Sequence, residues 1–175
     1  MTEAQLSNAM DAYGSTVYRL ALTRMQNIAD AEDVYQEVFL RLWKQAAEDW
    51  DGDRAKAWLI RTTLNRCADL HRFRLRRPVL CFAEISDLAQ PEDESRELWE
   101  AVSRLPEKAR TAVHLYYAEG YSAEEISQLM HIPAATVRTR LHRARKQLKE
   151  LLGGIDDETC VSRSDGTNFG PQRAE

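Results

Sequence analysis

The segment that most constrains the fold is residues 122–147, where two short helical patterns flank a sharp corner. Ser122 and Glu125 have the spacing of a capping box, in which the Ser oxygen accepts the amide hydrogen three residues on and the Glu side chain reaches back. The corner has the sequence HIP, and Pro133 is suited to opening the next helix. Two helices joined in this way form a helix-turn-helix, which places its second helix in the major groove of DNA. The sequence therefore predicts a helical DNA-binding unit here.

The second helix of this pair combines a buried stripe with a cationic outer face. Apolar residues recur at helical spacing, and we expect the following to be buried: Val137, Leu141, Ala144 and Leu148. The outer face supplies the candidate DNA contacts, which are Ala135, Thr136, Arg138, Thr139, Arg140 and Arg143. The short side chains near the helix start let the backbone approach bases, and Arg can hold a guanine edge or a phosphate. A solvated basic face is the alternative interpretation.

The formal net charge of the whole chain is −4, which conceals two concentrated basic blocks. Residues 54–77 hold eight basic and one acidic side chain, net +7, and residues 134–152 hold six and one, net +5. Charges separated by more than about 8 Å are largely screened at physiological salt, so attraction to phosphate depends on local density. The acidic remainder does not exclude DNA binding, and it indicates that other surfaces meet a different partner.

The first basic block differs from the second because aromatic rings alternate with its charges. Trp58, His71 and Phe73 lie among arginines that include Arg61 and Arg66. Flat rings can stack on exposed bases while Arg follows the backbone, which suits single-stranded or opened DNA. Trp58 taken alone could equally belong to the core.

Helical periodicity dominates the chain and no strand alternation is convincing, so we expect an all-α fold. Two small helical domains are predicted over residues 1–77 and 99–152. The segment between them, residues 78–98, is acidic and poorly periodic and is predicted to be a flexible linker. A surface loop within one domain is the alternative. The Gly- and Asp-rich residues 153–175 are expected to be a disordered tail.

A polar strip on the predicted helix over residues 31–45 admits three interpretations. Asp33, Gln36 and Glu37 are spaced i, i+3 and i+4 and therefore share one side. They could be a solvated face, a docking surface for a basic partner, or part of a metal-dependent nuclease, although no third acid or His completes a metal site. The residues expected to point inward from this helix are Val34, Val38, Phe39, Leu42 and Trp43.

Other kinds of chemistry find little support in the sequence. The cysteines, Cys67, Cys81 and Cys160, are widely spaced and predict free thiols. Cys67 and His71 lie one helical turn apart, but no second pair accompanies them, so we predict no metal, no cofactor and no catalytic residues. No apolar run is long enough to span a membrane and the N-terminus lacks the pattern of a signal peptide, which together predict a cytoplasmic protein.

Three motifs, in order, resemble those of the extracytoplasmic-function (ECF) group of sigma factors, the small two-domain branch of the sigma-70 family. They cover about residues 8–152. The segment DAEDVYQEVFLRLWK of this chain resembles the family's core-binding helix. The segment AWLIRTTLNRCADLHRFRLRR resembles the family's helix for the −10 promoter element. The segment LPEKARTAVHLYYAEGYSAEEISQLMHIPAATVRTRLHRARKQL resembles the family's helix-turn-helix for the −35 element.

The resemblance implies a transcription initiation factor that binds core RNA polymerase, directs it to promoters and helps melt the DNA. Asp33, Gln36 and Glu37 would face the clamp helices of the β′ subunit, and the surface near residues 105–117 would meet the β flap. The loop at residues 48–53 would hold a flipped base, and the residues implied at the −10 element are Asp51, Asp53, Trp58, Arg61, Asn65 and Arg66. The outer face of the second basic helix would contact the −35 element. The acidic linker would thread polymerase channels that otherwise carry nucleic acid, and an anti-sigma factor is the expected controller.

Two departures from the family pattern stand out. Ala135 occupies a position that is often Gly, which bears on how closely the helix start approaches DNA, and the tail after residue 152 is not part of the common pattern. A stand-alone helix-turn-helix regulator is the main alternative function, and it predicts tight binding to a palindromic operator without polymerase. A nuclease using Asp33 and Glu37 is the third.

Overall fold

The computed structural model describes residues 2–45, 52–76 and 93–152, and within these ranges the chain is helical and contains no strand. Its elements in chain order are α1 (Glu3–Met25), α2 (Ile28–Lys44), α3 (Gly52–Arg76), α4 (Asp93–Ser103), α5 (Glu107–Val113), the π-helix η1 (His114–Ala118), α6 (Ala123–Met130) and α7 (Ala134–Leu151). The all-α prediction is confirmed. Residues 78–92 of the predicted linker, the predicted tail, and Asp51 in the predicted base-holding loop lie outside the described residues, whereas residues 93–98, also assigned to the linker, begin helix α4.

Helices α1 and α2 are joined by a corner whose residue types satisfy both helix ends. Thr2 and Gln5 form a capping box at the start of α1. Gln26 ends the helix in the left-handed region, with φ of 51°, and Asn27 then caps α2 by accepting the amide hydrogen of Asp30 at 3.0 Å. Side chains thus satisfy amides that have no partner within the helix, and the chain reverses within two residues.

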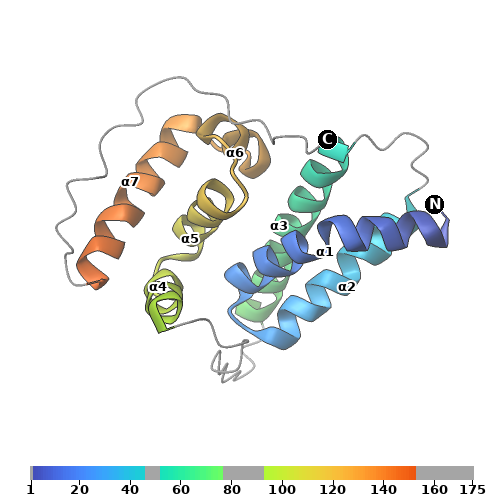
Figure 1. The fold of residues 1–175 in the computed structure, drawn as a ribbon, viewed down its shortest axis with the longest axis horizontal. Helices are drawn as coiled ribbons and strands as arrows, with labels where there is room; N and C mark the ends of the chain where they lie inside the picture. The colour runs from blue at the N-terminus through green and yellow to red at the C-terminus, as the bar shows by residue number, and fades with distance from the viewer. Residues whose placement is uncertain (1, 46–51, 77–92, 153–175) are drawn as a thin grey trace.

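Helices α1, α2 and α3 pack into a bundle on one side of the molecule (Figure 1). The inward prediction for α2 holds for Val34, Val38, Phe39 and Leu42, which are at most 4% exposed. It is wrong for Trp43, which is 42% exposed. Adjacent helical residues lie about 100° apart around the axis, so the face that buries Leu42 leaves Trp43 at its edge.

The bundle also encloses Cys67, which is fully buried on α3. Burial raises the pKa of the Cys67 thiol to about 12, with nearby charges making smaller contributions of both signs. The thiol is therefore un-ionised at neutral pH, and the predicted free thiol is confirmed at this position.

Helices α4 to α7 form the other side of the molecule in Figure 1. Within the stripe predicted for α7, Val137, Leu141 and Ala144 are buried and Leu148 is partly buried. Helix α5 continues directly into the π-helix η1, so the last turn before Glu119 is wider than a regular α-helical turn. Gly120 follows with φ of +76°, a backbone conformation that favours glycine.

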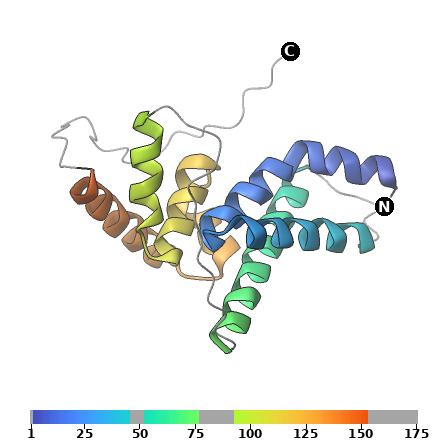
Figure 2. The ribbon, with the colours of Figure 1, turned by 90° about the horizontal axis from the view of Figure 1, so that it is seen from below.

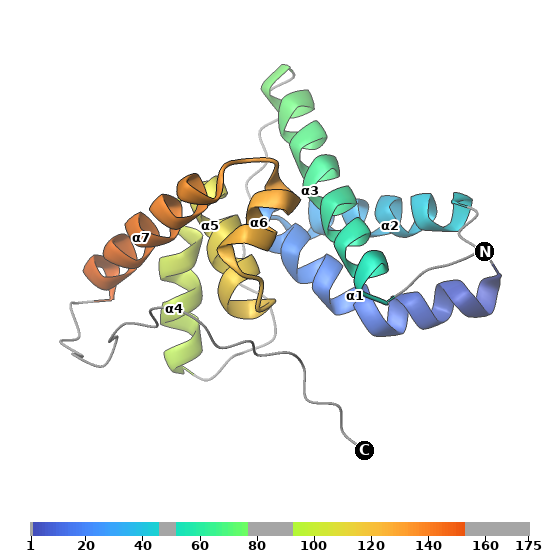
Figure 3. The ribbon, with the colours of Figure 1, turned by 90° about the horizontal axis from the view of Figure 1, so that it is seen from above.

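The two groups of helices pack directly against each other, with α5 against α1 and α6 against α3 (Figures 2 and 3). One hydrophobic cluster crosses the boundary, because Leu20 of α1 and both Ile60 and Leu64 of α3 join the core of the second group. Sequence analysis did not anticipate this contact.

Candidate nucleic-acid and polymerase interface

Helices α6 and α7 have the geometry of a capped helix-turn-helix. The Ser122 hydroxyl accepts the Glu125 amide hydrogen at 3.2 Å, and Glu125 accepts the Ser122 amide hydrogen at 2.8 Å, which confirms the predicted capping box. The corner turns at His131, whose φ is 52°, and Pro133 directly precedes the first residue of α7. The buried stripe of α7 fixes which face of the helix is presented outward.

The candidate DNA contacts on α7 gather on that outer face. Ala135, Arg138, Thr139 and Arg143 are exposed, and Thr136 and Arg140 are partly buried. The Thr139 hydroxyl donates to the Ala135 carbonyl at 2.9 Å, and Arg138 pairs with Glu124 of α6. Arg143 is exposed and lies one helical turn beyond Thr139 on this face.

One cation of the basic block, Arg145, contacts aromatic side chains of η1. The Arg145 Nε donates to the Tyr117 hydroxyl at 2.7 Å, and its guanidinium lies 5.9 Å from the ring centroids of both Tyr116 and Tyr117. Charge counting alone could not detect this arrangement, because it depends on η1 approaching α7.

On α3, Trp58, Arg61 and Asn65 are spaced i, i+3 and i+7 and so share a face. Arg61 and Asn65 are exposed, whereas Trp58 is partly buried and packs against the core of the first bundle, as the core interpretation expects; stacking of Trp58 on DNA stays a prediction. Asp53 is exposed in the first turn of the helix.

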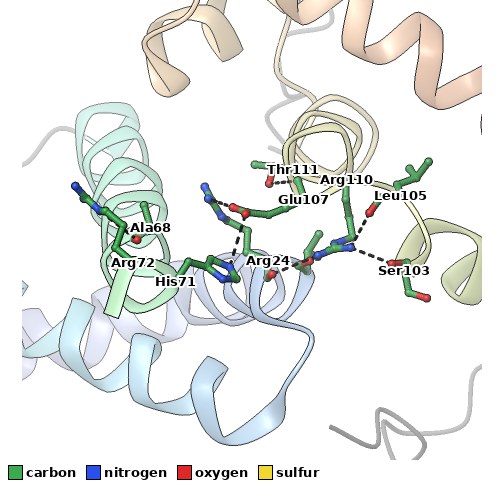
Figure 4. A network of polar contacts seen from close by, with 10 residues as sticks. Arg24, Ala68, His71, Arg72, Ser103, Leu105, Glu107, Arg110 and Thr111 are labelled. Atoms are coloured by element: carbon green, nitrogen blue, oxygen red, sulfur yellow. Dashed lines mark hydrogen bonds and ion pairs between the residues drawn. The ribbon is translucent and has the colours of Figure 1, made fainter. Parts of the chain in front are cut away.

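A shallow surface pocket continues from this face, and Leu70 is a member that sequence analysis missed. The pocket is lined by Arg66, Asp69, Leu70, Arg72 and Phe73. Phe73 is 54% exposed there, and Arg72 pairs with Asp69 at 2.6 Å. The third aromatic side chain of the block, that of His71, lies elsewhere: its Nε2 is 3.8 Å from Glu107 of α5 (Figure 4).

The polar strip of α2 is open to solvent and includes an apolar residue. Asp33 and Gln36 are exposed, and Glu37 accepts a hydrogen bond from the Arg41 Nε at 2.9 Å. Leu40, four residues after Gln36 and three after Glu37, lies on the same side and is 47% exposed. The strip is therefore an acidic surface that ends at an exposed leucine.

The described residues contain no group of three His, Cys, Asp or Glu side chains arranged to hold a metal ion. In the same ranges, none of the helices is both long enough and apolar enough to cross a membrane.

Comparison with protein families matches both halves of the chain. The model for sigma-70 region 2 matches residues 9–77, and the model for sigma-70 region 4 matches residues 95–148. The first match ends with α3, and the second contains the helix-turn-helix.

Individual relatives agree with these matches. The chain is 31% identical over 155 residues to the ECF RNA polymerase sigma factor SigM of Bacillus subtilis, covering 83% of this chain and 94% of that protein. It is 34% identical over 161 residues to the ECF RNA polymerase sigma factor SigE of Mycolicibacterium smegmatis, covering 86% of this chain and 62% of SigE. The fold matches the sigma factor RpoE of Bartonella quintana, solved with the anti-sigma factor NepR, with a TM-score of 0.73 over 87% of this chain and 99% of that chain at 22% identity. The chain belongs to the ECF group of the sigma-70 family of RNA polymerase sigma factors.

Proposed function

We propose that this chain directs core RNA polymerase to promoters, with α7 contacting the −35 element and α3 the opened −10 element. The observation that carries the proposal is the separation of three exposed faces: a cationic helix-turn-helix face on α7, a cationic and aromatic face on α3, and an acidic face on α2. Opposite charge is expected to steer the cationic faces to DNA and the acidic face to a basic protein surface. In this proposal residues 1–77 and 99–152 act as the two promoter-binding units.

At the −35 element, the start of α7 would approach the duplex with its short side chains, Ala135, Thr136 and Thr139. The helix N-terminus favours phosphate, and Arg140 and Arg143 would add base or backbone contacts. Arg138 would have to exchange its pairing with Glu124 for DNA.

At the −10 element, Trp58, Arg61, Asn65 and Arg66 would face the separated strand, with Asp53 at the start of α3 next to the base-holding loop. The pocket beyond Arg66 offers Phe73 as a further stacking surface.

The α2 strip of Asp33, Gln36 and Glu37, with Leu40 at its end, would dock on the β′ clamp helices. Contact with the β flap is predicted near residues 105–117. Leu105 is buried, so this contact would use exposed side chains in or beside that segment, such as Tyr117 and Trp99, which are about half exposed or more. An anti-sigma factor is proposed as a controlling partner.

Transcription reconstituted from purified parts tests the proposal. Mapping transcript starts after overexpression of the chain would identify the candidate promoters. On these promoters, core polymerase with this chain should start transcripts, and core polymerase alone should not. A mobility-shift assay without polymerase tests the stand-alone regulator, for which tight operator binding is required. DNA cleavage dependent on added Mg²⁺ would instead support the nuclease.

An Arg143→Ala change should weaken use of the −35 element. Loss of a base-reading Arg costs about 1–3 kcal/mol, or roughly 5- to 150-fold in promoter affinity of the polymerase complex. The measurement is promoter binding at fixed salt on the native −35 sequence and on single-base variants of it. Arg104→Ala is the matched control, since Arg104, directly after α4, is exposed and pairs with Glu100 of α4. Unchanged affinity of the Arg143→Ala complex would contradict the assignment.

A further inference from the structure

Glu119 is a buried carboxylate that connects the two groups of helices. Its side chain is only 4% exposed although it lies at the end of η1. The Thr16 hydroxyl of α1 donates to it at 3.1 Å, and Lys56 of α3 lies 3.1 Å from the same oxygen. Arg19 of α1 and His114 of η1 lie 3.8 Å from the other oxygen. A buried charge requires such partners, and three of these four come from the other half of the chain.

The π-helix explains how Glu119 reaches this position. A π-turn contains more residues per turn than an α-turn, so side chains that follow it are rotated relative to a regular helix, and such turns often occur at functional sites. Here His114 also faces α1, where its Nδ1 lies 3.3 Å from the Thr23 hydroxyl. Burial lowers the pKa of His114, opposed by the carboxylate of Glu119 and reinforced by Arg19, so the imidazole is neutral at pH 7 and leaves the negative charge of Glu119 to Lys56 and Arg19.

Arg110 of α5 forms a second connection, at the end of α1 (Figure 4). Its guanidinium donates to the carbonyls of Thr23 and Arg24, and also to those of Ser103 and Leu105 within its own half. The last carbonyls of a helix have no partner within the helix, so a side chain from α5 completes the C-terminus of α1. Arg110 itself is only 6% exposed.

Further contacts join the two groups of helices near Glu119 and Arg110. Arg24 pairs with Glu107 (Figure 4). The Gln26 side chain donates to the Ser103 carbonyl at 2.6 Å. Beneath the polar contacts lie Leu20 and Ile60, both fully buried in the shared cluster. We call this arrangement, with α5 to α6 packed on α1 and α3, the closed form.

The closed form is too compact to span a promoter. The position numbers −10 and −35 place the two elements about 25 base pairs apart, which is about 85 Å of duplex at about 3.4 Å per base pair. Helix α3, with 25 residues, is only about 37 Å long, and a compact chain of 175 residues has a radius of gyration of about 16 Å. Both promoter elements can be occupied together only after the two halves separate.

We propose that the contacts of Glu119 and Arg110 form a clasp that holds the free chain closed, and that this clasp must open before both promoter elements are bound. The requirement for opening rests on the proposed function, whereas the clasp itself rests only on the contacts above. Because the buried Glu119 side chain faces cations and a hydroxyl, reversing its charge is the sharpest way to open the clasp while leaving the DNA-facing residues intact.

The test is small-angle X-ray scattering of the free, full-length chain. Wild type should fit the closed form, and Glu119→Lys should raise the radius of gyration by roughly 5 Å, the scale expected when two compact halves separate on a tether. Glu100→Lys is the matched control: it makes the same charge change at a Glu that is 61% exposed on α4, and it should leave the radius unchanged. Circular dichroism of each variant should retain the helical signal of wild type.

A charge swap guards against a variant that simply misfolds. Lys56→Glu should also expand the chain, and the double variant Lys56→Glu with Glu119→Lys should recover compactness. An extended wild type, or a Glu119→Lys chain as compact as wild type, would overturn the clasp. Because scattering involves neither polymerase nor promoter, a compact wild type that opens on charge reversal but fails to start transcription would reject the proposed function and leave the clasp standing.

Discussion

A Glu37→Arg change in α2 should abolish association with core RNA polymerase. Glu37 lies beside exposed Leu40 on the acidic strip, and reversal would place a cation against the basic surface that the strip is proposed to meet. Central contacts of a protein interface commonly cost at least about 2 kcal/mol when lost, or roughly 30-fold in affinity, and like-charge contact adds to this. The measurement is co-elution or calorimetric binding of the variant with purified core enzyme.

The fold should tolerate this change, because Glu37 is a surface residue. It would lose one ion pair with Arg41 and gain a like-charge neighbour four residues on, each worth only a few tenths of a kcal/mol. Glu100→Arg is the matched control, since Glu100 also pairs with an Arg four residues on, at 2.7 Å. Wild-type binding by Glu37→Arg, with Glu100→Arg equally unaffected, would remove the role assigned to α2.

An Arg110→Ala change should produce the largest loss of stability. Truncation would strand buried carbonyls of Thr23, Leu105 and their neighbours, and breaking a buried charged contact of this kind costs about 3 kcal/mol. For a chain of this size the melting temperature should fall by roughly 6–12 °C, measured by circular dichroism. Burial lowers the pKa of Arg110, and the nearby Glu107 carboxylate opposes that shift, so the guanidinium stays charged in the folded chain.

Arg110→Lys distinguishes loss of charge from loss of geometry. A lysine keeps the charge but lacks the planar fork that serves several carbonyls at once, so its melting temperature should lie between wild type and Arg110→Ala. Arg104→Ala, an exposed site, should melt with wild type. Equal melting of Arg110→Ala and wild type would show that the carbonyls at the end of α1 do not depend on this side chain.

Local features of this fold could be predicted because their causes are local. The Ser122–Glu125 capping box and the buried stripe of α7 each follow from spacing within one or two turns, and the structure has both. The outward orientation of Arg143 follows from the same stripe. The prediction for Trp43 is wrong because it treats every apolar residue on α2 as buried. The apolar face of α2 is broader than the part that α1 and α3 cover, and Trp43 lies outside that part.

The contacts between the halves could not be predicted, because they join residues far apart in the chain. Thr16 and Glu119 are separated by 103 positions, and in the sequence Arg110 is one more charge in a polar helix. A buried Arg is distinguished from an exposed one only by the carbonyls around it. The π-turn likewise has no known signature in HLYYA, and it decides where Glu119 lies.

The extra residue of that π-turn also makes the coupling between the halves sensitive to chain length. Deleting one residue from His114–Ala118 would restore regular winding and swing the following side chain about 100° around the axis, carrying the Glu119 carboxylate away from Thr16 and Lys56. Single-residue insertions and deletions at this turn would thus change how readily the two folded halves separate in related chains, while the side chains that contact nucleotides stay the same.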